Sequence, residues 1–232
     1  MRKKKIIITG GNGRFAKVLR KFNPNFLYPN KNQLNILNLN SIRSYVKKNK
    51  VKYIIHNAAL SRPMEIHNSE IAKSIDINII GTCNMVKICN ELNIKLIYFS
   101  TGYVYEGKKG NYKEEDPVKP INNYAWSKMG GECAVQMYKN SLILRITMTE
   151  KPFQYKQAFT NLISNFMYHE DLVKILPSII NKKGILNVGG KQQSVYNFAK
   201  SKKINVKKAK LSKSDKIPAN QGMNISKLKK IL

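Results

Sequence analysis

The chain has 232 residues, of which 42% are hydrophobic, enough to bury the core of one large domain. No apolar run is long enough to cross a bilayer, and the apolar residues after the basic start are too few for a signal peptide. The three cysteines have neither a metal-ligand nor a redox spacing, so we expect no metal site. These features predict a reduced, cytoplasmic protein without a membrane segment.

The charge is extreme, because 42 Lys and Arg residues face 13 Asp and Glu residues for a formal net charge of +29. Such a field attracts polyanions, including nucleic acid and phosphorylated metabolites. The basic residues are scattered, apart from one run over residues 200–213, and Asn and Ile are abundant throughout, as in proteins from AT-rich genomes. We therefore interpret the charge as compositional and do not expect nucleic acid to be the partner.

A buried strand is expected over residues 4–9, which contain an unbroken run of three isoleucines, and a helix is expected over 14–21. Between them lies a glycine-rich turn with the spacing G-x-x-G-x-x-A. Glycine allows the backbone to approach a pyrophosphate, and the helix amino terminus offers N–H groups and a positive dipole end. The sequence predicts a dinucleotide site here, with cofactor contacts from Gly10, Asn12, Gly13, Arg14 and Phe15.

A second strand is expected over 25–28. Folds that select NAD place an acidic residue near the end of this strand, to bind the adenosine ribose. Residues 29–32 contain no acid, but they contain Lys31. A cation suits a 2′-phosphate, so we expect NADPH as the cofactor, with NADH as the alternative.

The next expected elements are a helix over 41–50 capped by Asn40 or Ser41, a strand over 52–55 and a long helix over 70–92. Ala58 and Ala59 follow the strand, and such small residues let a cofactor approach the backbone. His56 is interpreted as a packed core histidine. Gly81 lies inside the long helix, where we expect close packing against the sheet to offset its low helix propensity.

A buried strand over 96–99 is followed by Ser100, Thr101 and a polar loop, and a helix begins at about residue 122. Tyr124 and Lys128 are four residues apart on this helix, so their side chains share one face. Free tyrosine titrates at about pH 10, and a neighbouring ammonium favours the phenolate. The pair is a candidate proton donor, with Thr101 as a hydrogen-bonding partner for the same substrate oxygen.

Another buried strand is expected over 141–146, and the alternation of strands and helices predicts a parallel sheet covered on both faces. After Arg145 the regular alternation stops. We expect a loop over 147–160, followed by the short elements of a cap at the carboxyl edge of the sheet: a helix within 159–180, a strand and turn over 184–190, a helix over 195–200 and an amphipathic piece over 224–232.

Eight motifs occur in one order along the chain: TGGNG (9–13) with Ala16, NAA (57–59), NIIGT (78–82), STGYVYEG (100–107), YKEED (112–116), NYAWSK (123–128), NVGG (187–190) and NISKL (224–228). With these motifs the sequence resembles the extended short-chain dehydrogenase/reductases. Within them it is most similar to the dTDP-4-dehydrorhamnose reductase family of nucleotide-sugar reductases.

The resemblance implies an α/β fold with a Rossmann-type doubly wound parallel sheet in residues 1–150 and a small, shortened substrate cap in residues 151–232. It implies NADPH-dependent reduction of a nucleotide-linked 4-keto-6-deoxy-sugar, as in dTDP-rhamnose biosynthesis. Tyr124 would donate the proton, Lys128 would hold the nicotinamide ribose, and Thr101 would orient the carbonyl oxygen. The oligomeric state is left open, with a homodimer as one expectation.

Two features depart from the family pattern. Gly102 stands where these reductases usually have Asp, and a dehydratase would need an acid pair after Thr101, so we do not expect a dehydratase. The region after Arg145 is also shorter than usual. Three alternatives therefore stay open: a nucleotide-sugar epimerase, a non-catalytic NADPH-binding regulatory subunit, and a binder of nucleic acid or acidic surfaces.

Overall fold

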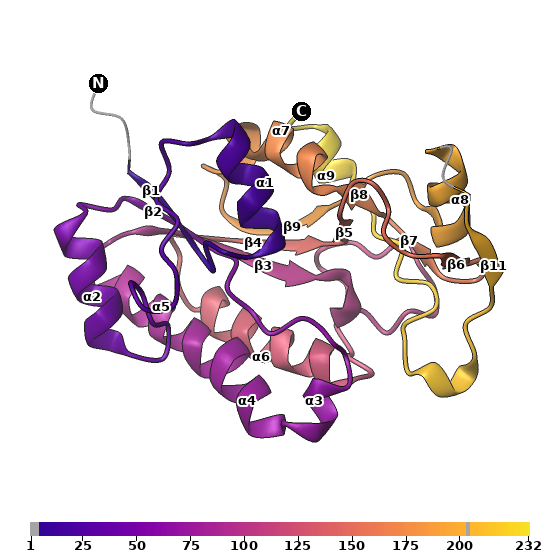
Figure 1. Ribbon diagram of the computed structural model, residues 1–232, viewed down its shortest axis with the longest axis horizontal. Coiled ribbons are helices and arrows are strands. Elements are labelled where there is room, and N and C mark those ends of the chain that lie inside the picture. Colours follow the sequence, from indigo (N-terminus) through magenta and orange to yellow (C-terminus); the bar gives the residue numbers. More distant parts are fainter. Residues whose placement is uncertain (1–4, 203–204) are drawn as a thin grey trace. The chain divides into compact units, whose positions relative to one another are not determined.

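The computed structural model describes residues 5–202 and 205–232, and its central element is a five-stranded parallel sheet (Figure 1). The strand order is β1-β2-β3-β4-β9. The strands are β1 (Ile6–Thr9), β2 (Tyr53–His56), β3 (Lys95–Thr101), β4 (Ser141–Ile146) and β9 (Gly184–Val188). The expected α/β class with a parallel sheet is confirmed. The basic start at residues 1–4, including the first residue of the first expected strand, lies outside the described residues, as do residues 203–204 of the basic run.

Helices alternate with these strands along the chain. In order they are α1 (Arg14–Phe22), α2 (Leu39–Lys48), α3 (Ile66–Ser69), α4 (Ile71–Ile75), a π-helical turn (Asp76–Ile80), α5 (Gly81–Glu91) and α6 (Asn123–Gln136). The long helix expected over 70–92 is thus α4 and α5 joined through the π-helical turn. Within the described ranges, the structure contains no helix of the length and apolarity needed to span a membrane.

The first of two compact units comprises residues 1–100, 127–143 and 180–184. Its core is built from strand residues with 0% exposure, among them Ile7, Ile8, Ile54 and Ile55. β1 and β2 pair in parallel with Thr9 opposite His56. Figure 1 shows α1 on one side of these strands and α2 with α5 on the other. The sheet of this unit is therefore covered on both faces.

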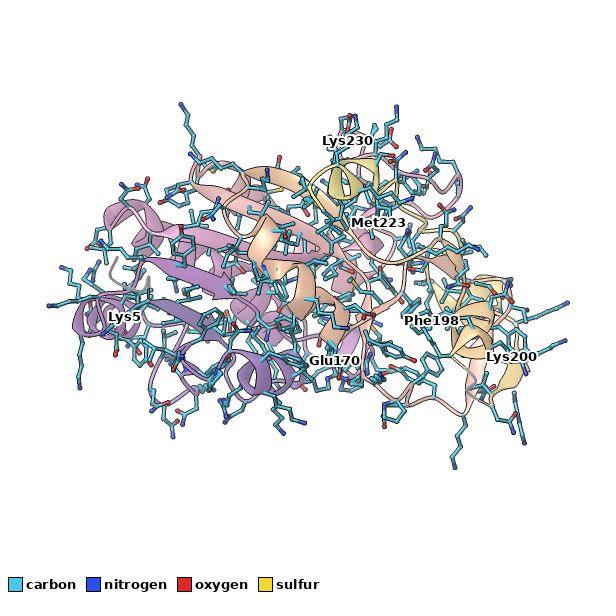
Figure 2. All side chains as sticks on the ribbon, turned by 90° about the horizontal axis from the view of Figure 1, so that it is seen from above. Lys5, Glu170, Phe198, Lys200, Met223 and Lys230 are labelled. Atoms are coloured by element: carbon cyan, nitrogen blue, oxygen red, sulfur yellow. The ribbon has the colours of Figure 1, made fainter. Side chains whose placement is uncertain are left out.

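The second unit comprises residues 101–126, 144–179 and 185–232. It contains short paired strands: β5 (Met148–Thr149) with β8 (Met167–Tyr168), β6 (Gln157–Phe159) with β11 (Lys207–Ala209), and β7 (Ile163–Ser164) with β10 (Gln193–Ser194). Its helices are α7 (His169–Ile179), α8 (Val195–Ser201) and α9 (Ser226–Lys229). One hydrophobic core in this unit surrounds Phe198, which Figure 2 labels, and includes Phe153, Leu162 and Tyr168.

Four expectations about local structure are wrong. The segment 25–28 is not a regular strand, because Leu27 makes one isolated bridge with Ile7. Helix α2 is capped by Asn38, which accepts the Ser41 N–H at 2.9 Å, and not by Asn40 or Ser41. A Cβ on Gly81 would meet the Ile36 side chain rather than the sheet. The expected loop over 147–160 contains β5 and β6. The division of the chain at residue 150 stays a prediction.

Candidate cofactor and catalytic site

The glycine-rich turn after β1 fits closely against neighbouring backbone. Gly10 has φ +69°, a conformation that glycine adopts without strain, and a Cβ there would lie 3.0 Å from the Ala58 Cα. A Cβ on Gly11 would overlap the Tyr28 carbonyl. The Gly13 N–H closes the turn on the Gly10 carbonyl at 2.8 Å. The turn is therefore a backbone cradle that side chains at these positions would disrupt.

Helix α1 begins directly from this cradle. Gly13 is its N-cap residue and has no side chain to cap the first turn. No acidic residue lies in that turn, so the positive end of the helix dipole is not offset locally. Asn12 and Arg14 are exposed beside it, and Phe15 is buried against Phe99 of β3 with ring centroids 5.1 Å apart. The arrangement has the features of a pyrophosphate site, with Phe15 anchoring the helix rather than facing a ligand.

The loop after β2 is fixed under the cradle by a buried hydrogen-bond network around His56, which is 1% exposed. Thr82 Oγ1 donates to the Asn78 carbonyl, so it accepts from His56 Nε2 at 3.1 Å. His56 Nδ1 then accepts from Thr9 Oγ1 at 2.8 Å. The same Thr9 oxygen accepts the N–H groups of Asn57 and Ala58. His56 is a neutral core histidine, as expected from the sequence.

Burial, and secondly the charge of Lys128, lower the pKa of His56 to about 3. The imidazole therefore stays uncharged at neutral pH, and its role is to hold the segment that carries Ala58 and Ala59. Both alanines are half-buried and follow the carboxyl end of β2. Ala58 lies against Gly10 of the glycine turn, and the cofactor contact expected of Ala58 and Ala59 stays a prediction. Sequence reasoning missed the network that fixes this segment.

Asn78, in the π-helical turn, connects this loop to α6. Its amide oxygen accepts the Leu60 N–H at 2.8 Å, and its amide nitrogen donates to the Leu60 carbonyl and to Ser127 Oγ.

Lys31 is exposed in the turn after Pro29, whose carbonyl accepts the Gly11 N–H at 3.1 Å. Lys31 thus belongs to a segment that flanks the cradle, as a group contacting the adenosine end of a dinucleotide must.

Helix α6 carries Tyr124 and Lys128 one turn apart. Lys128 is 4% exposed, and its Nζ lies over the Tyr98 ring, 4.2 Å from the centroid. The Tyr98 hydroxyl donates to the Lys128 carbonyl at 3.0 Å, which fixes this turn of the helix to β3. Burial lowers the pKa of Lys128 to about 7, and the nearby Glu132 carboxylate acts in the opposite direction. The ammonium is therefore poised to lose its proton near neutral pH.

Glu132 is a buried charge that sequence reasoning missed. It is 0% exposed, and it accepts a hydrogen bond of 2.6 Å from Ser100 Oγ at the end of β3. It lies one turn beyond Lys128 on the same helix, which is the signal that could have identified it. The Glu132 carboxylate favours the ammonium form of Lys128.

Thr101 and Tyr124 both lie in the second unit and are linked through Tyr103. Thr101 Oγ1 accepts the Tyr103 N–H at 3.3 Å, which leaves its hydroxyl proton for a substrate oxygen. The Tyr103 ring meets the Tyr124 ring edge-on, with centroids 5.7 Å apart. Tyr124 is half-buried. Tyr103 thus contacts both the Thr101 hydroxyl oxygen and the Tyr124 ring.

Gly102 lies where a side chain would crowd two neighbouring polar groups. A Cβ at residue 102 would lie 3.1 Å from Thr147 Oγ1 and 3.3 Å from Gln221 Oε1. Gln221 is 0% exposed, so its side chain takes up the space beside residue 102. No carboxylate can be placed next to Thr101 without moving these groups.

Among the described residues, no cluster of His, Cys, Asp and Glu could hold a metal ion.

Comparisons with known proteins agree with this geometry. The family described as RmlD substrate binding domain matches residues 4–176. Methionine adenosyltransferase 2 subunit beta from Bos taurus is 30% identical over 143 residues, covering 57% of this chain and 42% of that protein. A dTDP-4-dehydrorhamnose reductase from Aggregatibacter actinomycetemcomitans is 29% identical over 179 residues, covering 74% and 60%.

A solved dTDP-4-dehydrorhamnose reductase from Bacillus anthracis, in complex with NADP, superposes with a TM-score of 0.84 at 25% identity, covering 99% of this chain and 92% of that one. The sequence matches to the first curated relatives are shorter, since the chain spans less than half the length of those proteins. The family match over three quarters of the chain, with a parallel sheet and a glycine cradle in the expected places, shows that the chain belongs to the RmlD substrate-binding domain family.

Proposed function

We propose that the protein reduces the keto group of a nucleotide-linked 4-keto-6-deoxy-sugar with NADPH, NADH being the alternative cofactor. The observation that carries the proposal is the presence of both the backbone cradle at Gly10, Gly11 and Gly13 and the buried Lys128 on α6. The structure of the Bacillus anthracis relative contains NADP, which supports the choice of cofactor.

The cradle fits a dinucleotide, because Gly10, Gly11 and Gly13 leave room only for backbone and so admit a pyrophosphate against the start of α1. Lys31 and Arg14 would bind the adenosine ribose and its 2′-phosphate. Ala58 and Ala59 would line the adjoining backbone. When bound, the nicotinamide supplies a hydride to the sugar carbon.

The chain's own groups would handle the proton. Tyr124 donates its phenolic proton to the oxygen that gains charge, while Thr101 donates a hydrogen bond to the same oxygen. Protonated Lys128 stabilises the resulting phenolate and binds the nicotinamide ribose hydroxyls. The Glu132 carboxylate opposes the effect of desolvation and so raises the protonated fraction of Lys128.

The test follows NADPH absorbance at 340 nm with dTDP-4-keto-6-deoxy-D-glucose as substrate. Tyr124→Phe keeps the ring that packs on Tyr103 and removes only the proton donor, so we expect turnover to fall at least ~100-fold. The control is the affinity for NADPH, which should change less than about threefold. A variant with unchanged turnover would refute the assignment of Tyr124.

A second candidate function is regulation of a methionine adenosyltransferase. It is favoured by the first relatives, which are named as a subunit of that enzyme. The discriminating experiment mixes the chain with a methionine adenosyltransferase catalytic subunit. A change in that enzyme's KM or kcat, with retained NADPH affinity and no reduction of nucleotide-sugars, would support regulation over catalysis.

We also propose a cytoplasmic location and a nucleotide-sugar partner. All three cysteines, Cys83, Cys89 and Cys133, are free thiols, which fits a reducing compartment. The homodimer stays a prediction, which sedimentation analysis of the purified chain would test.

A further inference from the structure

An open groove of about 1090 Å³ lies in the first unit, at the amino-terminal ends of the strands. Five of its lining residues are lysines: Lys5, Lys47, Lys50, Lys52 and Lys95. We call it the lysine groove. The glycine cradle and the Ala58 loop follow the opposite, carboxyl ends of β1 and β2. A four-residue strand is about 13 Å long, so the groove is separate from the proposed cofactor site.

Three of the lysines lie where adjacent strands begin. The Lys52 N–H donates to the Lys5 carbonyl at 2.9 Å, and the Lys95 N–H donates to the Lys52 carbonyl at 3.1 Å. Lys5 and Lys52 directly precede Ile6 and Tyr53, which are register partners, so these two like charges start from neighbouring positions about 4.8 Å apart and repel each other. Lys95 is the register partner of Tyr53, so its side chain starts from the opposite face of the sheet. Figure 2 labels Lys5.

Lys95 is the most constrained of the five. It is 6% exposed, and its Nζ donates to the Lys182 carbonyl at 2.5 Å. Burial, and secondly the charge of Lys183, lower the pKa of Lys95 to about 8. The ion pairs found in the described part of the chain do not include Lys95. A cation is therefore held in a low-dielectric position with another cation nearby and no carboxylate.

The remaining lining residues suit a ligand that is anionic along its length. None of the described residues that line the groove is acidic. Asn93, Asn140 and Asn181 contribute amide groups that can donate hydrogen bonds. Leu92 and Ile94 add apolar surface. Five cations exceed what a monoanion neutralises, whereas a chain of linked phosphates carries several negative charges in one ligand.

We propose that the lysine groove binds a condensed phosphate, either the polyphosphate chain of a nucleotide or an inorganic polyphosphate. The occupant is held by charge-assisted hydrogen bonds from Lys5 and Lys52 at the starts of β1 and β2, with Lys47 and Lys50 closing the groove from the end of α2 and the charge of Lys95 adding to the attraction.

Isothermal titration of the full chain with sodium tripolyphosphate and, in a second arm, with ATP tests the proposal. The test variant is Lys47→Gln/Lys52→Gln, which removes two exposed lining lysines. The matched control is Lys48→Gln/Lys87→Gln, which removes two exposed lysines of the same unit that do not line the groove. We expect the test pair to weaken binding about 100-fold, tenfold for each lysine, and the control pair less than about threefold.

Tighter binding of ATP than of tripolyphosphate would identify a nucleotide as the source, and equal binding would identify an inorganic chain. Equal losses in the test and control pairs would overturn the proposal, because the affinity would then come from the overall charge. It would also be overturned if wild-type protein bound duplex DNA through Lys47 and Lys52 but did not bind tripolyphosphate.

Discussion

The buried ammonium of Lys128 makes the stability of the fold depend on pH in a specific direction. Its pKa is lowered from 10.5 to about 7 by burial. Between these values the unfolded chain binds a proton that the folded chain does not, so the free energy of unfolding rises with pH through this window. At 1.36 kcal/mol per pKa unit, the shift of Lys128 changes the free energy of unfolding by about 5 kcal/mol over the whole window. Between pH 7 and pH 9 the free energy of unfolding rises by about 2 kcal/mol.

Lys128→Met removes the titrating group and keeps a side chain of similar length. We expect the free energy of unfolding of the wild type, minus that of the variant, to rise by about 2 kcal/mol from pH 7 to pH 9. Urea unfolding followed by far-ultraviolet circular dichroism at each pH measures it. Lys139→Met, at an exposed lysine just beyond α6, controls for the loss of a surface charge. If the free energy of unfolding changed with pH equally in the wild type and in Lys128→Met, burial would not lower the pKa of Lys128 as described.

Three further predictions concern the site. Glu132→Gln removes the carboxylate that raises the pKa of Lys128, so the alkaline limb of the kcat profile should move to lower pH in the NADPH oxidation assay. Gly11→Ala places a methyl group against the Tyr28 carbonyl, and we expect NADPH affinity to fall at least ~10-fold and stability to fall by about 2 kcal/mol, measured by titration and urea unfolding. Lys31→Gln should reduce the preference for NADPH over NADH, as the ratio of kcat/KM values, by about tenfold.

Two of these predictions have a control variant. Gly184→Ala tests backbone strain alone, since Gly184 has φ +81° and a Cβ there would meet nothing within 4 Å; it should leave NADPH affinity unchanged. Lys17→Gln, at an exposed lysine of α1, should leave the cofactor preference unchanged. A pH profile of Glu132→Gln that coincides with the wild type would contradict the coupling between Glu132 and Lys128. Equal NADPH selectivity in Lys31→Gln and wild type would remove Lys31 from the site.

Local patterns allowed much of the fold to be predicted. The strand at 141–146, the turn from Gly10 to Phe15 and the pair Tyr124 and Lys128 depend on residues close together in sequence. The cap of α2 was wrong because Asn38, Asn40 and Ser41 are all good capping residues within one helical turn. The strand expected at 25–28 was wrong because apolar composition does not determine how far a segment stays paired.

The contacts that long-range packing creates could not be predicted. Glu132 meets Ser100 across 32 residues, and His56 meets Thr9 across 47. The glycine spacing predicted a tight turn at this position, yet the reason for Gly11 is the Tyr28 carbonyl, which only the folded chain brings near. Burial set the pKa of Lys128, and burial at a single position is a property of the tertiary structure.

The most direct measurement of the proposed reaction uses NADPH carrying deuterium at the transferred position together with dTDP-4-keto-6-deoxy-D-glucose. The account predicts a reduced sugar with deuterium bound to C4, formed by the wild type and not by Tyr124→Phe. A wild-type protein that binds NADPH but yields no deuterated sugar would contradict it.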